Sequence, residues 1–194
     1  MARTKSKTDA QVLDDGLALA MRSGLPAITF AALAQRCGLS PATLVQRFST
    51  KDELKRRILL HAWDRLDEAT AELDTTVPRT PEGAIELLIE LSAQYEDREA
   101  YPHGLLLLRE DVLDPHLRRR GVAWEAGLVA ALGSRLGTGE EGGAVLAAYW
   151  QGVICWWAFH DDEPLVEHLA RKLGILLDLV RAGSLGGCTS SAAT

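Results

Sequence analysis

The sequence predicts an all-α protein of about nine helices, with a three-helix head at the N-terminus and a larger helical body behind it. Every long segment repeats apolar residues at spacings of three and four, which is the helical period. No segment has the pattern of a strand, and prolines and glycines stand where helices begin or end. With 194 residues, 47% of them hydrophobic, the chain has enough material for a substantial core.

The head is predicted from an amphipathic first helix that ends at Ser23-Gly24 and from two short helices on either side of Gly38. Residues 29–54 read TFAALAQRCGLSPATLVQRFSTKDEL. Glycine at position 38 tolerates the left-handed backbone of a sharp helix exit. Ser40 is a typical N-cap, and Pro41 occupies the first helical position, where its missing N–H costs nothing. The pattern is typical of a helix-turn-helix, although a chance pair of helices has the same local signals.

The second helix of this pair turns Leu44 and Phe48 inward and leaves its other residues without a surface to cover. In a helix-turn-helix the start of the second helix enters the major groove of DNA. Gln46 can pair with adenine, and Arg47 with guanine or with a phosphate, while the apolar side chains can touch a thymine methyl group. The outward residues are Pro41, Ala42, Thr43, Val45, Gln46 and Arg47.

Phosphate contacts are expected where helices begin. Thr29 and Lys51 stand at predicted helix N-termini, where free N–H groups and the positive end of the dipole favour an anion. Ser40 and Thr43 add hydroxyl donors. Residues 1–8 form a polar arm that we expect to be disordered; its basic residues either reach a neighbouring groove or are an ordinary solvated terminus. These residues are Arg3, Lys5 and Lys7.

The segment from Asp9 to Leu60 resembles the DNA-binding domain of the TetR family of transcriptional regulators. The resemblance depends on the signals above together with Leu33-Ala34, Thr43-Leu44, Phe48 and Lys51-Asp52-Glu53-Leu54. Family members usually carry an aromatic residue at the position of Val45, and often a basic residue or glycine at Pro41-Ala42. These departures imply an operator unlike those of well-known relatives.

Charge divides the chain at the same place as the motif. Residues 1–60 hold ten Lys or Arg and five acids, whereas the remainder holds eleven basic and 22 acidic residues. A polyanion is attracted to such a head and repelled by such a body, so DNA binding should weaken with salt. The alternative is that exposed helices simply differ in charge.

The body is predicted to be helical throughout. A long helix starting near Lys51 places Leu54, Ile58, Ala62, Leu66, Ala69 and Leu73 on one face, and residues 75–81 end it. Further helices are expected over about 85–95, 104–111 and 115–136, and after Pro164. The resulting domains are a DNA-binding domain at 1–52, a ligand-binding and dimerisation domain at 53–183, and a disordered tail at 184–194.

Residues 143–159 form the most apolar helix, with Gln151 as the only strongly polar residue. A helix apolar on all sides is either buried all round or crosses a membrane. It is short for a membrane span and has acidic flanks, so burial is the better interpretation. Coverage by a second copy is expected, because the TetR resemblance implies a homodimer formed by this helix and the one after it, reading a pseudo-palindromic operator. The expected interface residues are Trp156, Leu165, Leu169, Leu173, Leu176 and Val180.

The same resemblance implies a small-molecule pocket in the body. Aromatic residues offer surface to a flat or apolar ligand, and a cation can stack on them; core packing explains each residue singly just as well. The candidates are Trp63, Tyr95, Tyr101, His103, Leu107, Trp124, Tyr149 and Trp150.

Catalysis, cofactors and metals are not expected. Residues 137–142 match GxGxxG, but no strand precedes them and two acids stand where a pyrophosphate would lie. The five histidines form no metal motif, and the three cysteines are far apart, which favours two buried thiols, Cys37 and Cys155, and a tail residue, Cys188, in a reducing cytoplasm. The expected function is a homodimeric repressor released from its operator by a small molecule. The alternative is a dimeric DNA-binding regulator whose body is only a dimerisation or protein-docking module.

Overall fold

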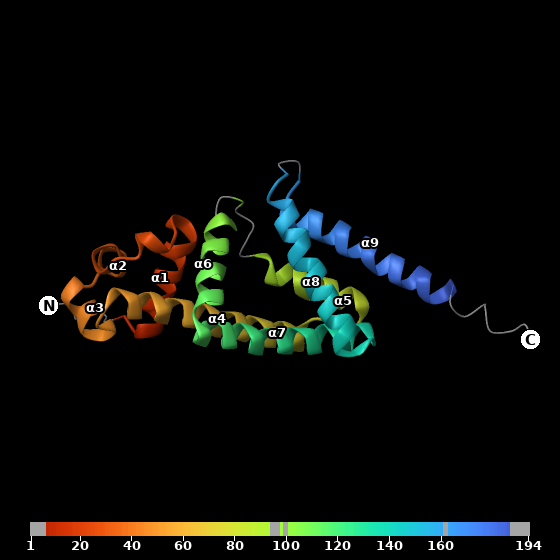
Figure 1. Cartoon of the computed structure of the whole chain (residues 1–194), viewed down its shortest axis with the longest axis horizontal. Helices are drawn as coiled ribbons and strands as arrows, with labels where there is room; N and C mark the ends of the chain where they lie inside the picture. The colour runs from red at the N-terminus through yellow and green to blue at the C-terminus, as the bar shows by residue number, and fades with distance from the viewer. Residues whose placement is uncertain (1–6, 94–97, 99–100, 161–162, 187–194) are drawn as a thin grey trace, which may run out of the picture. The chain divides into compact units, whose positions relative to one another are not determined.

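The computed structural model describes residues 7–93, 98, 101–160 and 163–186. Within these ranges every regular element is helical, with nine α-helices and one short 3-10 helix (Figure 1). The all-α prediction is therefore confirmed. Arg3, Lys5, Tyr95 and Cys188 fall outside the described residues.

The helix boundaries follow the caps and breakers of the sequence. Pro41 and Pro115 each open a helix, Lys51 begins the long one, and the last helix continues through Gly186, beyond the expected start of the tail. In chain order the elements are α1 (Asp9–Ser23), η1 (Leu25–Ala27), α2 (Phe30–Cys37), α3 (Pro41–Phe48), α4 (Lys51–Thr76), α5 (Pro81–Leu91), α6 (Tyr101–Leu113), α7 (Pro115–Leu136), α8 (Gly139–Trp157) and α9 (Leu165–Gly186).

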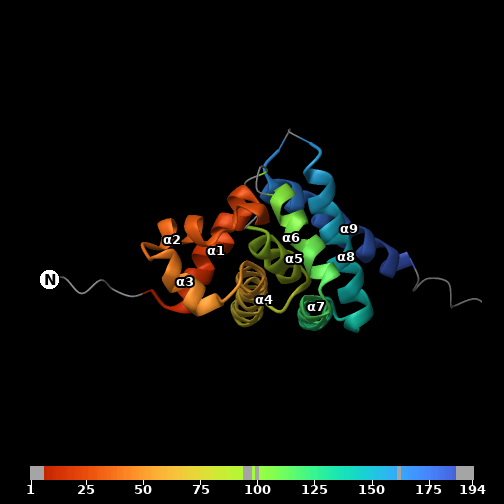
Figure 2. The ribbon, with the colours of Figure 1, turned by 60° about the vertical axis from the view of Figure 1, so that its left-hand side comes forward.

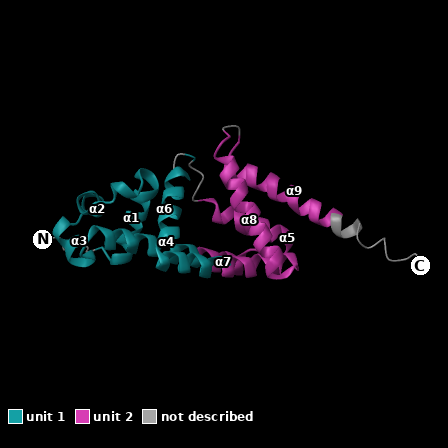
Figure 3. Cartoon of the chain, viewed as in Figure 1, with its two compact units in different colours: residues 1–68, 97–125 teal, residues 69–96, 126–194 magenta. Residues whose placement is uncertain are grey.

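The chain divides into two compact units (Figure 3). Unit 1 consists of Met1–Glu68 and Asp97–Glu125, and unit 2 of Ala69–Glu96 and Ala126–Thr194. Unit 1 therefore holds the three head helices, the first part of α4, α6 and the first part of α7. The predicted boundary at residue 52 separates a DNA-binding domain from a ligand-binding and dimerisation domain by function, and it stays a prediction.

Unit 1 has one core around the head helices, which lie together in both views (Figures 1 and 2). Helix α6 packs against α1 and η1. His103 Nδ1 on α6 lies 3.0 Å from the Met21 carbonyl oxygen of α1. A body helix thus forms part of the head's own core, which local periodicity gave no means to predict. The fully or nearly fully buried side chains of the unit 1 core include Val12, Ile28, Leu33, Leu44, Phe48, Leu54, Ile58 and Leu117.

Unit 2 is built from α5, α8 and α9, with α9 packing against both of the others, and from the ends of α4 and α7. One face of α8 is buried through Leu146, Trp150, Ile154 and Trp157, among others. A single chain does not cover this helix on every side, and its coverage by a second copy stays a prediction. Its opposite face is open to solvent, because the helices of unit 2 cover one side only: Val145 and Trp156 are 65% and 66% exposed, and Phe159, just after the helix, is 74% exposed.

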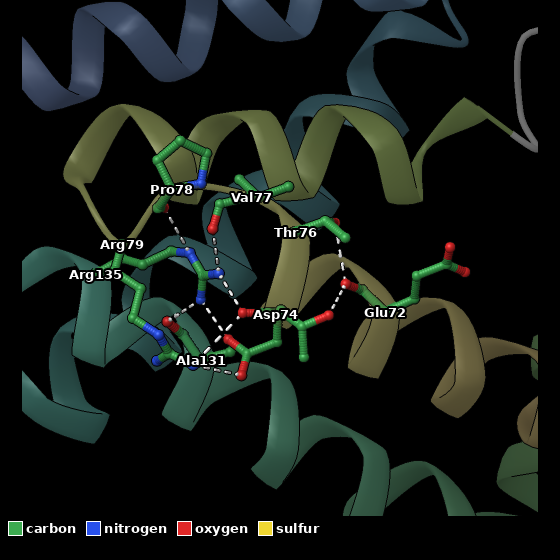
Figure 4. A network of polar contacts seen from close by, with 9 residues as sticks. Glu72, Asp74, Thr76, Val77, Pro78, Arg79, Ala131 and Arg135 are labelled. Carbon is green, nitrogen blue, oxygen red and sulfur yellow. Dashed lines mark hydrogen bonds and ion pairs between the residues drawn. The ribbon is translucent and has the colours of Figure 1, made fainter.

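A buried arginine fixes the end of α4 within unit 2 (Figure 4). The guanidinium of Arg135 on α7 is 0% exposed and pairs with the Asp74 carboxylate. It also donates to the carbonyl oxygens of Asp74, Val77, Pro78 and Ala131, at 3.1, 3.1, 3.2 and 3.1 Å. The last carbonyl groups of a helix have no partner inside it. Arg135 supplies that partner for α4 and for the turn that follows.

Replacement of Arg135 by Met should destabilise the protein by about 3–5 kcal/mol, because it leaves Asp74 and several carbonyl groups without their donor. Chemical denaturation of the full chain measures this loss. The matched control is Arg79→Ala, which removes the other arginine paired with Asp74, at 60% exposure. That change should cost less than about 1 kcal/mol. Equal losses in the two variants would contradict the capping role.

Candidate nucleic-acid interface

The turn between α2 and α3 has the geometry that the sequence predicted. Gly38 is left-handed, with φ 66° and ψ 31°, and its N–H donates to the Ala34 carbonyl oxygen. The N–H of Thr43 donates to Ser40 Oγ at 3.1 Å, and the N–H of Ala32 donates to Thr29 Oγ1 at 3.1 Å. Both predicted caps are thus confirmed. Each cap satisfies one N–H group in the first turn of its helix.

Helix α3 buries only Leu44 and Phe48, which are 0% and 1% exposed. Pro41, Ala42, Val45 and Gln46 are exposed, and Val45 is 44% exposed although it is apolar. Thr43 is half-buried, and its hydroxyl lies 2.8 Å from Ser40 Oγ. An outward-facing helix start that combines a proline, two apolar side chains and an amide can meet base edges in a groove.

Arg47 does not stand free beside Gln46. Its Nη1 donates to the carbonyl oxygen of Lys7 at 2.8 Å and lies 3.3 Å from Asp9 Oδ1, and its side chain is only 23% exposed. The guanidinium therefore joins the C-terminal half of α3 to the chain just before α1. Sequence reasoning could not find this contact, because its partners lie about forty positions away.

A short junction connects α3 to α4. Ser49 has φ 58° and ψ −64°, and the N–H of Thr50 donates to the Phe48 carbonyl oxygen at 2.6 Å, which makes a γ-turn centred on Ser49. This conformation is rare and strained for a residue with a side chain. Thr50 Oγ1 then accepts the Glu53 N–H at 3.1 Å and caps α4. Thr50 was not among the predicted site residues, although the pattern Thr50-Lys51-Asp52-Glu53 is that of a capping box.

The basic residues of the head divide into paired and available side chains. Lys7 and Arg36 both pair with Asp15, which also accepts a hydrogen bond from the Cys37 thiol at 3.3 Å. Burial and the Asp15 carboxylate raise the pKa of Cys37 to about 11, so this thiol stays protonated. Lys51 is exposed at the start of α4 and, within the described residues, forms no ion pair. Its charge is therefore available to an external anion.

The predicted ligand residues are distributed over both units. In unit 1, Tyr101 and Leu107 are buried, and Leu107 belongs to the core that holds the head. Trp63 and Trp124 are half-buried with ring centroids 5.9 Å apart, and His103 is engaged with the Met21 carbonyl. Unit 1 therefore brings the two tryptophans together.

In unit 2 the candidates are already occupied by contacts within the chain. Trp150 is 3% exposed, and its Nε1 donates to Ser92 Oγ at 2.8 Å. The Tyr149 hydroxyl donates to the Lys172 carbonyl oxygen at 3.5 Å. These placements favour packing as the role of Trp150.

The α9 stripe expected at the dimer interface needs a correction. Leu165, Leu169 and Leu173 are 2%, 0% and 0% exposed, because this face of α9 packs against α5 and α8 of the same chain. Leu176 is half-buried, whereas Trp156 and Val180 are 66% and 51% exposed. A second apolar set on α9, which was not among the predicted interface residues, faces outward: Ile175 and Leu179 are 49% and 65% exposed.

Cys155 is exposed on α8, which corrects the expectation of a buried thiol, whereas Cys37 is buried as expected. In the ranges that the structure describes, no three His, Cys, Asp or Glu side chains are placed to hold a metal ion. Among the described helices, none is both long and apolar enough to cross a membrane.

Comparison with known proteins agrees with this geometry. Residues 12–58 match the family model of bacterial regulatory proteins, tetR family. A search of the curated proteins gives no match. The fold resembles the TetR family regulator PfmR from Thermus thermophilus, at 22% identity and a TM-score of 0.60, over 87% of this chain and 97% of that one.

Two further solved structures are similar and carry ligands. A regulator from Saccharomonospora viridis in complex with choline has 20% identity and a TM-score of 0.66, over 86% of this chain and 93% of that one. The multidrug binding protein EbrR complexed with proflavin has 22% identity and a TM-score of 0.56, over 85% and 96% of the two chains.

The capped helix pair, the outward side chains of α3 and the family match together define a helix-turn-helix DNA-binding transcriptional regulator. Residues 12–58 form a DNA-binding domain of the tetR family of bacterial regulatory proteins. The role that this domain assigns to the chain is regulatory DNA binding.

Proposed function

We propose that the chain is a homodimeric repressor that binds a pseudo-palindromic operator and is released from it by a small molecule. The observation that carries the DNA-binding half is the exposed start of α3, where Pro41, Ala42, Val45 and Gln46 face outward. Gln46 reads adenine, and Ala42 and Val45 contact thymine methyl groups. Thr29, Ser40, Thr43 and Lys51 contact phosphates. Arg47 holds the chain before α1, as its hydrogen bond to Lys7 supports.

In vitro selection of bound DNA identifies the operator. Two variants tested on that operator then distinguish residues that recognise bases from residues that contact phosphates. Gln46→Ala should lose about 1–3 kcal/mol of discrimination at one base pair in each half-site. Lys51→Ala should weaken binding to all sequences alike and lower the slope of log K against log salt by about one per subunit. Fluorescence anisotropy over a salt series measures both.

The control for this pair is Lys172→Ala, which removes the same charge from α9 and should leave operator binding unchanged. A Gln46→Ala protein that keeps its full base preference would contradict the assignment. So would a Lys51→Ala protein that loses sequence preference instead of affinity.

The dimer is proposed to form through an outward apolar surface of α8 and α9 in unit 2. Trp156 and Phe159 lie with ring centroids 5.6 Å apart and are both largely exposed. Large apolar side chains exposed together, as these two are, mark an interaction surface. A two-fold axis would bring the surface against its own copy, which covers both partners at once. The surface consists of Val145, Trp156, Phe159, Ile175, Leu179 and Val180.

Trp156→Glu should convert the dimer to a monomer, because it places two charges in an apolar contact related by the two-fold axis. Light scattering after size-exclusion chromatography measures the mass, and operator affinity should fall at least about tenfold, or 1.4 kcal/mol. The matched control is Val122→Glu, at a residue that is also exposed, at 61%, but lies on α7 in unit 1. A dimeric Trp156→Glu protein, or a monomeric Val122→Glu protein, would contradict this interface.

Release by a small molecule is supported by the tryptophan pair of unit 1. Trp63 and Trp124 keep partly exposed rings beside α6, and α6 packs directly against α1 of the head. A ligand that prefers one arrangement of these helices shifts the population of DNA-competent heads by its difference in affinity. The choline and proflavin complexes of two proteins with this fold support a ligand of similar size.

The test is a thermal-shift screen of apolar and cationic compounds, followed by titration into the protein–operator complex. A compound that raises the melting temperature of free protein and dissociates the complex is the expected result. If a broad screen yields no such compound while operator binding is intact, the body is only a dimerisation or docking module.

A further inference from the structure

The tryptophan pair of unit 1 includes a third residue, the carboxylate of Asp111. Trp63 on α4 donates its indole N–H to Asp111 Oδ1 on α6 at 3.2 Å. Trp124 on α7 tilts against Trp63 at 51°. All three side chains are half-buried, so each keeps some surface open to solvent. Three helices of one unit thus present two indole rings and one carboxylate at the same place.

Among the described residues, no lysine, arginine or histidine forms an ion pair with Asp111. Two arginines on the other helices of the site, Arg56 of α4 and Arg120 of α7, pair with other acids: Arg56 lies 3.8 Å from Asp114, and Arg120 pairs with Asp64 and Asp67. Burial raises the pKa of the Asp111 carboxyl to about 6, and the charges of Asp114 and Glu110 act in the same direction. A half-buried carboxylate without a counter-charge is costly for a fold to keep.

The indole of Trp63 is held in place by the backbone beneath it. A Cβ atom at Gly121 of α7 would lie 3.2 and 3.3 Å from two carbons of this ring, so glycine lets the ring lie flat against the helix. On α6, Leu108 stands one turn before Asp111 on the same face and is 50% exposed. The rings and the carboxylate are therefore preorganised and have an apolar border.

We propose that Trp63, Trp124 and Asp111 form the recognition site for an organic monocation, either a quaternary ammonium group or a flat protonated heterocycle. A cation over an indole face is attracted by the ring quadrupole, and more strongly where water is excluded. The Asp111 carboxylate supplies the charge opposite to that of the ligand. The cation in turn supplies the counter-charge that no side chain among the described residues gives to Asp111. This proposal rests on the ligand response proposed above and gives that ligand its chemical class.

The site also explains how such a cation acts on the head. It contacts α4, α6 and α7 within unit 1, and α6 is joined to α1 through His103 and the Met21 carbonyl. A cation that draws α6 and α4 toward itself moves the helices that support α3. The path from ligand to reading helix then lies inside one compact unit.

The experiment titrates choline, its uncharged isostere 3,3-dimethylbutanol, and proflavin into the full-length protein and into its operator complex. Asp111→Asn should weaken binding of choline and proflavin at least about tenfold, because it removes the charge and keeps the shape. The control Glu110→Gln removes the adjacent carboxylate, which pairs with Arg109, and should change affinity less than about twofold. Trp124→Phe, which keeps the carboxylate, should give a smaller loss. Melting temperatures establish that each variant is folded.

A second readout is pH. Lowering the pH from 7 to 5 protonates Asp111, so wild-type affinity for choline should fall, whereas the Asp111→Asn protein should show no such change. The other charged groups that act on Asp111 are Glu110 and Asp114 on α6. On the helices packed around it, Arg56 of α4 lies 3.8 Å from Asp114, and Arg120 of α7 pairs with Asp64 and Asp67 of α4. Hydrogen bonds to the N–H groups of His116 and Leu117 keep the pKa of Asp114 below its usual value, so Asp114 stays ionised throughout this range.

Equal affinity of wild type and Asp111→Asn for both cations overturns the proposal, as does equal binding of choline and its neutral isostere. If a neutral compound releases the operator while the cations do not, the cation site is wrong and ligand release stands. If no compound of any class releases an operator that the protein binds, the ligand response itself is wrong.

Discussion

Two buried side chains anchor the reading helix in the head core, and its outward surface depends on this. Leu44 and Phe48 lie four residues apart, which on a helix is one face, and they are the only residues of α3 that are buried. The guanidinium of Arg57 lies over the Phe48 ring, 5.9 Å from its centroid, and adds to this anchoring. Because one narrow face is fixed in the core, the exposed positions of α3 lie on the opposite side, while Thr43 and Arg47 are half-buried. The outward direction of Val45 and Gln46 therefore follows from packing.

Much of the head could be predicted from sequence because its signals are local. Gly38, Ser40 and Thr29 act on N–H and C=O groups within four residues of themselves, and periodicity alone places Leu44 and Phe48 inward. The clasp of Arg47 on the chain before α1 and the packing of α6 on the head join residues far apart in sequence. The α9 stripe failed for a different reason. This helix has two apolar faces, and periodicity does not say which one packs within the chain and which is left for a partner.

Arg135 and Asp111 are both charged residues removed from solvent, but they differ in how many partners the chain gives them. Arg135 is fully buried and has a carboxylate and four carbonyl oxygens around it, so its charge is satisfied inside the chain. Asp111 is less buried and, among the described residues, has only an indole N–H. The first arrangement is what structural stability requires, since a buried charge needs all its partners. The second is incomplete by itself, which is what a binding site requires.

The γ-turn at Ser49 limits how this regulator can change its target. A turn of this kind, closed by the hydrogen bond from Thr50 to Phe48, leaves only two residues between the reading helix and α4. With so little slack, α3 cannot be re-aimed in the groove without also moving the start of α4, on which the head core depends. New operator preferences must then arise by exchange of the outward side chains of α3. Pro41, Ala42 and Val45 are exposed, so they can be exchanged without disturbing the core of the head.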